Sequence, residues 1–363
     1  MDYKDKVAAL RERMTDSREE NEKMLKAEGE KYAKSGDVDG LKAVGELLIE
    51  NMTEESRNEL NRLTHVDGMR LDEVHNKILK LIDEKKSLEA VPLAERLYKK
   101  ITVEYAPTEK SKFVSLRNPF EDNLCQLLFK DDRILNRTPF DFSQYITTYA
   151  YLLVDTGATV NAIPILETAI EYNPVDVGPR FELCEIYKII HNKKMVLQTT
   201  RETLQIASSP IAIARCYANV GYALTESGDY EDAAAFYVAS VMFAPNPAVP
   251  LEMKHLTDLK GTPIIKPSRE KMVEIMKKYD MEYGPSKPVI EVATALATHY
   301  IKINDIPNAL NALKITYNLT LDQNVKKLIL SYEPMARMIR PDPKNVDAAQ
   351  INRANITQTK SEE

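Results

Sequence analysis

Two histidines give the most direct hint of chemistry in this sequence. His65 and His75 stand ten residues apart in THVDGMRLDEVH with acidic residues between them, and imidazole and carboxylate groups are common zinc ligands. Helical zinc sites, however, place two histidines four residues apart so that both project from one face. A structural role is therefore favoured. The segment GDVDG at 36–40 begins like a calcium loop but lacks the acidic ligands that should follow, so we expect a turn between two helices there.

The other residue types that could do chemistry are not arranged for it. Cys125, Cys184 and Cys216 are far apart, odd in number and without CxxC spacing, which argues against a disulfide framework or a zinc site and suits a reducing compartment. The chain has no HExxH, GxSxG or GxxxxGK[ST] motif. The sequence therefore predicts a protein that is not an enzyme, with no catalytic residue, no cofactor and no metal site.

The bulk composition narrows the function further. The 363 residues carry a formal net charge of −6 with a pI near 5.6, whereas dedicated nucleic-acid binders usually have a basic surplus. The first twenty residues lack the apolar stretch of a signal peptide, and apolar runs such as YAYLLV at 149–154 are far shorter than the ~20 residues that span a bilayer. We expect a cytoplasmic protein that binds neither nucleic acid nor membrane.

Charged and aromatic residues divide the chain into four expected regions. Residues 1–100 contain 20 Lys/Arg and 23 Asp/Glu but only three aromatic side chains, which predicts a charged, solvated helical region. For the charged run within residues 1–34, a coiled-coil helix for a partner is the alternative. Residues 101–142 are interpreted as an irregular insert or linker, in which ITVEY and KFVSL could form a small β-hairpin. Residues 143–338 have a clear helical period, and the polar segment 339–363 is expected to be disordered.

The clearest helical pattern is YANVGYALTESGDYEDAAAFYVASVMFAP at 217–245, which predicts two helices joined at SGDY. Gly221 and Ala233 lack bulk, so the two helices could approach closely. Tyr217 and Tyr237 would fill the space between successive hairpins. Similar patterns recur at 143–176 and, more weakly, at 177–213 and 290–323.

The repeat has a regular spacing. The expected helix-packing alanines are 72, 71 and 76 residues apart, at Ala90, Ala162, Ala233 and Ala309. Each interval is close to two units of roughly 34–38 residues. This pattern resembles the tetratricopeptide-repeat (TPR) family, most strongly over 214–247. The resemblance implies an all-α protein, in which helix hairpins stack into a right-handed superhelical array.

The resemblance also implies a binding face. In TPR arrays the first helix of each hairpin lines the concave surface, and its non-packing positions contact a peptide or helix of a partner. By register these positions are Thr147, Tyr151, Phe181, Glu185, Lys188, Arg215, Ala218, Tyr222, Glu226, Thr294, Thr298 and Lys302. Tyr151, Phe181 and Tyr222 would form an aromatic strip beside charged groups. Family members that clamp a C-terminal carboxylate have Asn where this chain has Tyr151, Glu185 and Tyr222, so no carboxylate clamp is expected.

The expected function is a non-catalytic protein–protein interaction module, a scaffold or adaptor that binds a peptide or helix on its concave face. A regulator that acts on transcription or RNA, which would need a basic face, is one alternative. An enzyme of unrecognised type is another. The N-terminal third could also fold back and fill the groove. The sequence leaves the partner, the biological process and the oligomeric state open.

Overall fold

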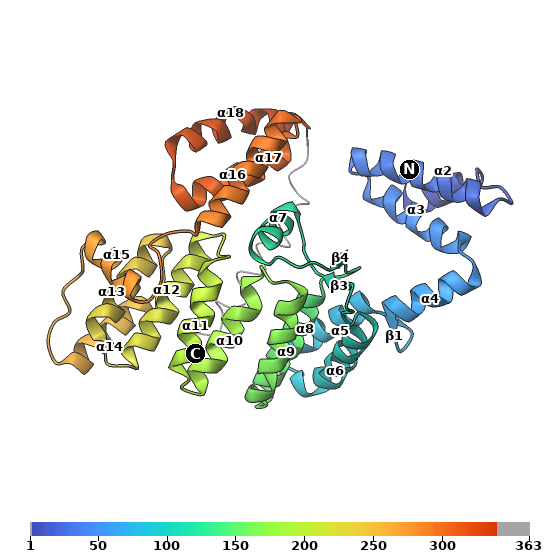
Figure 1. Ribbon diagram of the computed structural model, residues 1–363. Coiled ribbons are helices and arrows are strands. Elements are labelled where there is room, and N and C mark those ends of the chain that lie inside the picture. Colours follow the sequence, from blue (N-terminus) through green and yellow to red (C-terminus); the bar gives the residue numbers. More distant parts are fainter. Residues whose placement is uncertain (1, 340–363) are drawn as a thin grey trace.

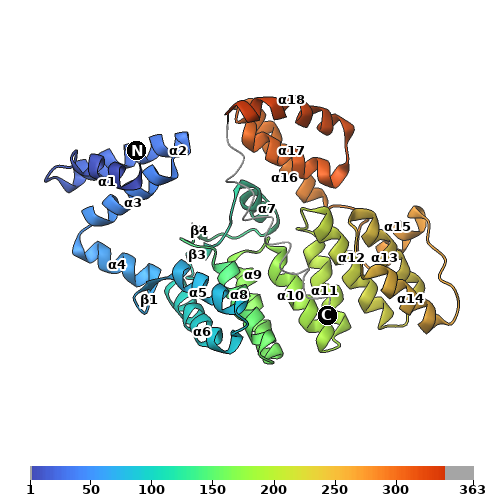
Figure 2. The same cartoon turned by 180° about the vertical axis from the view of Figure 1, so that it is seen from behind.

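The computed structural model describes residues 2–339 and shows an all-α helical repeat protein, with two small strand pairs in the described part (Figure 1). Residues 340–363, nearly all of the tail that was expected to be disordered, lie outside the described residues. Seen from the front and from behind (Figures 1 and 2), an N-terminal group of helices stands apart from a row of hairpins, and α4 joins the two.

The N-terminal group is a three-helix unit with its own small core. It consists of α1 (Tyr3–Arg11), α2 (Arg18–Ser35) and α3 (Val38–Asn51). Leu10, Leu25 and Leu47 are buried in a core that contains no residue of the hairpin row. Gly40 allows α3 to approach α2 closely, because a Cβ atom there would lie 2.4 Å from the ring of Tyr32.

The connecting helix α4 (Glu54–Thr64) has no buried residue. Apart from Leu60 and Leu63 its sequence is polar, which is typical of a helix that bridges two units through solvent, and Leu63 packs against the core of the hairpin row. Its C-terminal end is fixed to the row of hairpins: the hydroxyl of Tyr105 donates to the carbonyl oxygen of Leu63 at 2.9 Å, and Arg62 pairs with Glu104.

A tight β-hairpin leads from α4 into the row. β1 (His65–Val66) pairs antiparallel with β2 (Met69–Arg70). Asp67 and Gly68 between them both have positive φ angles, +50° and +76°, as a two-residue type I′ turn requires.

From α5 onward the helices form antiparallel hairpins that stack side by side. The pairs α5–α6, α8–α9, α10–α11, α12–α13 and α16–α17 each pack internally. The first helix of a hairpin also packs on the second helix of the one before, as α8 does on α6 and α12 on α11. α14 and α15 both pack on α13, and α18 packs on α17. The bounds are α5 (Leu71–Asp83), α6 (Ser87–Glu104), α7 (Pro119–Leu128), α8 (Phe142–Asp155), α9 (Ala162–Tyr172), α10 (Val177–Ile189), α11 (Lys193–Leu204), α12 (Pro210–Thr225), α13 (Tyr230–Phe243), α14 (Val249–Lys260), α15 (Arg269–Lys278), α16 (Lys287–Lys302), α17 (Ile306–Thr320) and α18 (Gln323–Ile339), with a 3₁₀ turn (Thr159–Asn161) before α9.

The helices pack on one another at the small residues that the sequence predicted for these contacts. The four alanines at the repeat spacing are fully buried: Ala90, Ala162, Ala233 and Ala309. A Cβ atom on Gly221 in α12 would lie 2.8 Å from the ring of Tyr237 in α13, so the glycine is needed for this close approach. The hairpin predicted over 217–245 is confirmed, with Gly228 at φ +83° in its turn.

Tyr217 connects the array to a later loop. Its ring is fully buried, and its hydroxyl donates to the carbonyl oxygen of Glu282 and accepts from the N–H of Gly284, both at 2.8 Å. These bonds fix the segment before α16 against α12. The core around Tyr217 is shared by α12, α13 and α15 and reaches α16.

The β-hairpin predicted from ITVEY and KFVSL is wrong. Residues 101–104 continue α6, because Ala94, Leu97 and Ile101 extend its buried stripe at helical spacing. β3 (Ser111–Val114) instead pairs in parallel with β4 (Ile134–Arg137), and α7 forms the crossover between them.

The helical packing also crosses the region boundaries that the sequence indicated. Position 100 falls inside α6, which packs on α8, and position 143 falls inside α8. The row of hairpins therefore begins at α5, within the charged first third. From the sequence only Ala90 of that hairpin was assigned to the repeat, because its surface carries many charges and its buried residues, apart from His75, are small or aliphatic.

Candidate functional site

The residues predicted for the binding face lie on four first helices, α8, α10, α12 and α16, except Glu226, which follows the last residue of α12. Those on α10 and α12 are in mutual contact. Phe181, Glu185 and Lys188 share one face of α10 at i, i+4 and i+7, and Arg215 and Tyr222 are seven apart on α12.

Cations lie on aromatic rings in this contact. The guanidinium carbon of Arg215 is 4.4 Å from the centroid of the Phe181 ring, and Lys188 Nζ is 5.4 Å from the centroid of the Tyr222 ring. Glu185 Oε1 lies 3.4 Å from Arg215 Nη2 and 3.0 Å from Lys188 Nζ. One carboxylate therefore bridges two cations, and each cation covers a ring.

Glu182 is a further member of this group that the sequence did not indicate. Its Oε1 lies 4.0 Å from Arg215 Nη2. Burial raises the pKa of Glu182, and the charge of Arg215 opposes the rise. The sequence could have indicated Glu182, because it is three residues from Glu185 and so lies on the same side of the helix. We call Phe181, Glu182, Glu185, Lys188, Arg215 and Tyr222 the α10–α12 cluster.

The aromatic strip is not formed as predicted. Phe181 is only 6% exposed and belongs to a core that also contains Leu116 and Leu124 of the insert, so it is not open to a partner. Arg215 covers its ring. Tyr151 and Tyr222 are half-buried. The sequence could not show that Phe181 shares a core with Leu116 and Leu124, because these two residues precede the helix by more than 50 positions.

The remaining predicted residues lie outside the cluster. The hydroxyl of Thr147 on α8 donates to the Ser143 carbonyl, and that of Thr298 on α16 donates to the Thr294 carbonyl. Ala218 is half-buried against the core, and the side chains of Glu226, Thr294, Thr298 and Lys302 are exposed.

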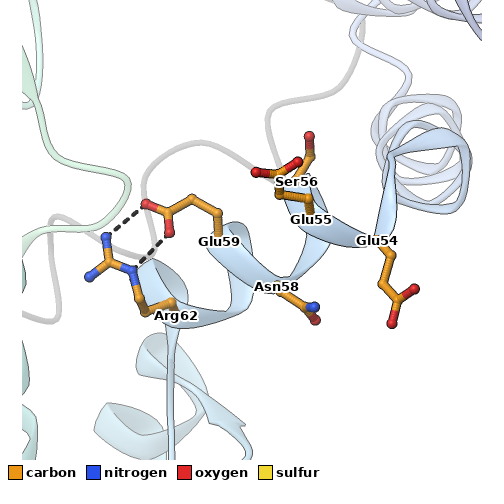
Figure 3. Close-up of a pocket in the computed structure, with 6 residues that line it drawn as sticks. All are labelled: Glu54, Glu55, Ser56, Asn58, Glu59 and Arg62. Atoms are coloured by element: carbon orange, nitrogen blue, oxygen red, sulfur yellow. Dashed lines mark hydrogen bonds and ion pairs between the residues drawn. The ribbon is translucent and has the colours of Figure 1, made fainter.

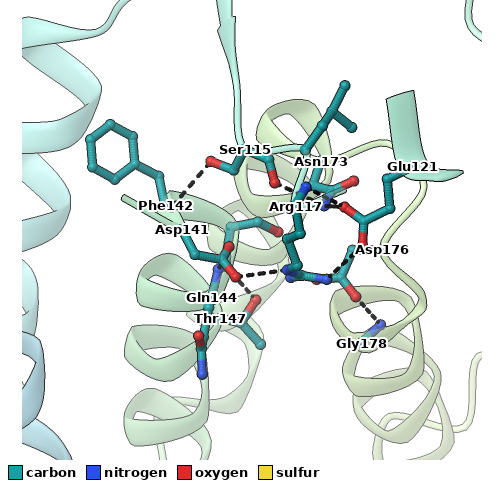
Figure 4. Close-up of polar contacts among 12 residues, drawn as sticks. Ser115, Arg117, Glu121, Asp141, Phe142, Gln144, Thr147, Asn173, Asp176 and Gly178 are labelled. Carbon is teal, nitrogen blue, oxygen red and sulfur yellow. Dashed lines mark hydrogen bonds and ion pairs between the residues drawn. The ribbon is translucent and has the colours of Figure 1, made fainter. Parts of the chain in front are cut away.

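The insert between α6 and α8 holds the first helices in place (Figure 4). Asp141 is the N-cap of α8 and accepts from Gln144 N at 3.1 Å, while Asp176 is the N-cap of α10 and accepts from Gly178 N at 2.9 Å. The guanidinium of Arg117 pairs with both carboxylates, through Nε to Asp141 Oδ2 at 2.7 Å and through Nη2 to Asp176. One side chain thus joins the starts of two neighbouring first helices.

Further contacts complete this arrangement. Glu121 Oε2 accepts from the backbone N–H of Arg117 at 2.8 Å and from Asn173 Nδ2 at 2.9 Å. Burial raises the pKa of Glu121, although Arg117 opposes it. For Arg117 itself burial lowers the pKa, but Asp176 and Asp141 outweigh this and raise the pKa overall. Since α7 also packs on α16, the insert contacts both the start and the later part of the row.

Two surface hollows lack the features of an active site. One is lined by Glu54, Glu55, Ser56, Asn58, Glu59 and Arg62, which all belong to the solvent-bridging helix α4 (Figure 3). The other, of about 310 Å³, lies between the end of α11 and residues 280–288. Its arginine, Arg201, already donates to the Tyr279 carbonyl through two nitrogens.

The buried histidine, the cysteines and the 36–40 segment are part of the packing and the turns of the fold. His75 is buried, stacks on Tyr145 at 4.1 Å between ring centroids, and has Nε2 3.0 Å from Thr148 Oγ1. The three cysteines are free and buried. Gly36 ends α2 in the left-handed conformation and Asp37 caps α3, so the predicted turn between two helices is confirmed at Gly36 and Asp37, while residues 38–40 already belong to α3. Over residues 2–339 no helix is long and apolar enough to cross a membrane.

No family model matches the chain, and no curated protein matches it in sequence. Among solved structures, it is similar to the C-terminal part of a TPR repeat-containing protein from Cytophaga hutchinsonii. The identity is 14%, the match covers 78% of this chain and 96% of the other, and the TM-score is 0.37. The helical repeat fold therefore rests on the hairpins themselves.

Proposed function

We propose that this protein is a non-catalytic scaffold of TPR type that binds a peptide or a helix of a protein partner on the face formed by its first helices. The observation that carries the proposal is the α10–α12 cluster. It combines half-exposed charges and the half-buried Tyr222 on two consecutive first helices, and such amphipathic aromatic and arginine side chains are enriched where proteins bind one another.

The charges of the cluster indicate what kind of partner fits. Its two carboxylates and two cations balance, and the two ion pairs of Glu185 leave no strong surplus of either sign. A segment of mixed polarity, with an apolar side chain against Tyr222 and polar groups that exchange with Glu185 and Arg215, matches this surface better than a strongly charged one. The three free cysteines support a cytoplasmic location.

The test is site-specific photocrosslinking in cells followed by binding measurements. A benzophenone amino acid at Tyr222 should capture a discrete partner segment that the same group at Leu251, an exposed residue on α14, does not capture. A synthetic peptide of that segment should bind the purified protein, and Tyr222→Ala should weaken its binding by about 30-fold.

A matched tyrosine separates binding from folding. Tyr217→Ala removes a fully buried ring and should lower the melting temperature, whereas Tyr222→Ala should lower it much less. Equal losses of stability in the two variants, or capture of the same segment from position 251, would show that the cluster is not the binding site.

A further inference from the structure

Helix α3 is apolar on two opposite faces. Ala43, Val44 and Leu47 point into the core of the N-terminal unit and are buried. On the other side Val38, Leu41, Gly45 and Ile49, with Met52 directly after the end of the helix, follow one another at helical spacing. Val38, Leu41 and Ile49 are 60%, 41% and 43% exposed, and Gly45 and Met52 are half-buried. A surface helix normally places polar residues on that side. We call these five residues the α3 stripe.

Gly45, at the centre of the stripe, is not needed by the fold of its own chain. A Cβ atom at Gly40 or Gly221 would lie within 3 Å of an aromatic ring, but a Cβ atom at Gly45 would meet nothing within 4 Å. Glycine inside a helix lowers helix stability relative to alanine. Its presence in an exposed apolar stripe is explained if another helix crosses there, since small residues let two helix axes come close.

The stripe has the symmetry of a surface that pairs with itself. Relative to Gly45, its other members stand at −7, −4, +4 and +7. When two identical helices cross antiparallel about a two-fold axis, position −x of one faces position +x of the other. Leu41 would then contact Ile49 of the second copy, and Val38 would contact Met52 of the second copy, with the two glycines at the crossing point.

The charges beside the stripe favour the same arrangement. Lys42, Glu46 and Glu50 follow one another four residues apart along its flank. Within their own chain both carboxylates lie beside Arg11, Glu46 at 3.9 Å and Glu50 at 2.7 Å, so a lysine of a second copy would join an existing ion pair. With 1.5 Å of rise per residue, Lys42 of one copy falls level between Glu46 and Glu50 of an antiparallel partner, about 3 Å along the axis from each. A parallel pair would instead place Lys42 beside Lys42.

We propose that α3 is a self-association surface, through which two copies of this chain pair antiparallel with their crossing point at Gly45. The surface lies on the N-terminal unit, away from the α10–α12 cluster, so it does not depend on the scaffold function proposed above. A single helix pair is a small interface, which places the association in the weak, concentration-dependent range.

Sedimentation velocity of the full chain, from about 1 to about 200 µM, tests the association. The parent should shift from monomer to dimer with concentration, and Leu41→Glu should weaken the dimer by about 30-fold or more, because it buries a carboxylate among apolar groups. Leu251→Glu, the same change at an exposed leucine on α14, should leave the dimer intact. A chain that stays monomeric at every concentration overturns the proposal, as does a dimer that survives Leu41→Glu.

Disulfide trapping tests the geometry. Two cysteines bond only when their Cα atoms come within about 7 Å. Gly45→Cys should therefore give a covalent dimer under mild oxidation, with no interference from the three buried native cysteines. Leu41→Cys should not link to itself, but the double variant Leu41→Cys/Ile49→Cys should link two chains. Self-linking of Leu41→Cys at the rate of Gly45→Cys would show a parallel pair and overturn the antiparallel arrangement.

Discussion

A side chain at position 221 has no room. The nearest atoms belong to the ring of Tyr237, which is 1% exposed and whose hydroxyl bonds to Glu252, so the ring cannot turn aside. We expect Gly221→Ala to lower the free energy of unfolding by about 1–3 kcal/mol through overpacking, despite the better helix propensity of alanine. Chemical denaturation of the purified protein measures this.

A double-mutant cycle identifies the cause. If the methyl group clashes with the ring, Gly221→Ala should lower the free energy of unfolding much less in a Tyr237→Leu background. The coupling free energy between the two changes should be about 1 kcal/mol or more. Strictly additive effects would show that the glycine serves something other than contact with Tyr237.

The same two residues show what a sequence can predict. Gly221 and Tyr237 lie within one hairpin, where spacing alone determines which side chains face each other, so their contact was predictable. The α10–α12 cluster was predictable in part, because two successive hairpins share a register. The burial of Phe181 and the network at Arg117 were not, since Asp141 and Asp176 are 24 and 59 residues from Arg117 and no local pattern connects them.

At the scale of elements, the insert fixes how α8 and α10 begin. Removing the guanidinium leaves the half-buried carboxylates of Asp141, Asp176 and Glu121 without their shared cation. We expect Arg117→Met to lower the free energy of unfolding by about 2–4 kcal/mol at neutral pH. The loss should shrink as the pH falls, because burial raises the pKa of Glu121 and protonation of this carboxyl removes one of the charges that Arg117 balances.

The matched control is Arg133→Met. Arg133 also pairs with an aspartate, Asp131, at 2.8 Å, but this carboxylate keeps a second cation, Lys112 at 2.8 Å, when Arg133 is replaced. Arg133→Met should lower the free energy of unfolding by less than about 1 kcal/mol. Equal losses for the two variants, or a loss at Arg117 that does not depend on pH, would mean that the network does not hold the helix starts together.

At the scale of the whole molecule, the structure predicts that the chain can be cut at one place in its first third and not at another. The N-terminal unit has its own core and α4 has no buried residue, so a chain that starts at Thr53 keeps all the described core residues of the hairpin row. It should keep the melting temperature of the row and, lacking α3, should be monomeric.

A chain that starts at Ala106 also loses α5 and α6, which uncovers the face of α8 that carries Tyr145 and Tyr149. This second chain should melt at least several degrees lower or aggregate, because a terminal hairpin protects the apolar face of its neighbour. Circular-dichroism melts of the two truncations decide the matter: if both melt like the full chain, the row begins at α8, and the charged first third is an appendage after all.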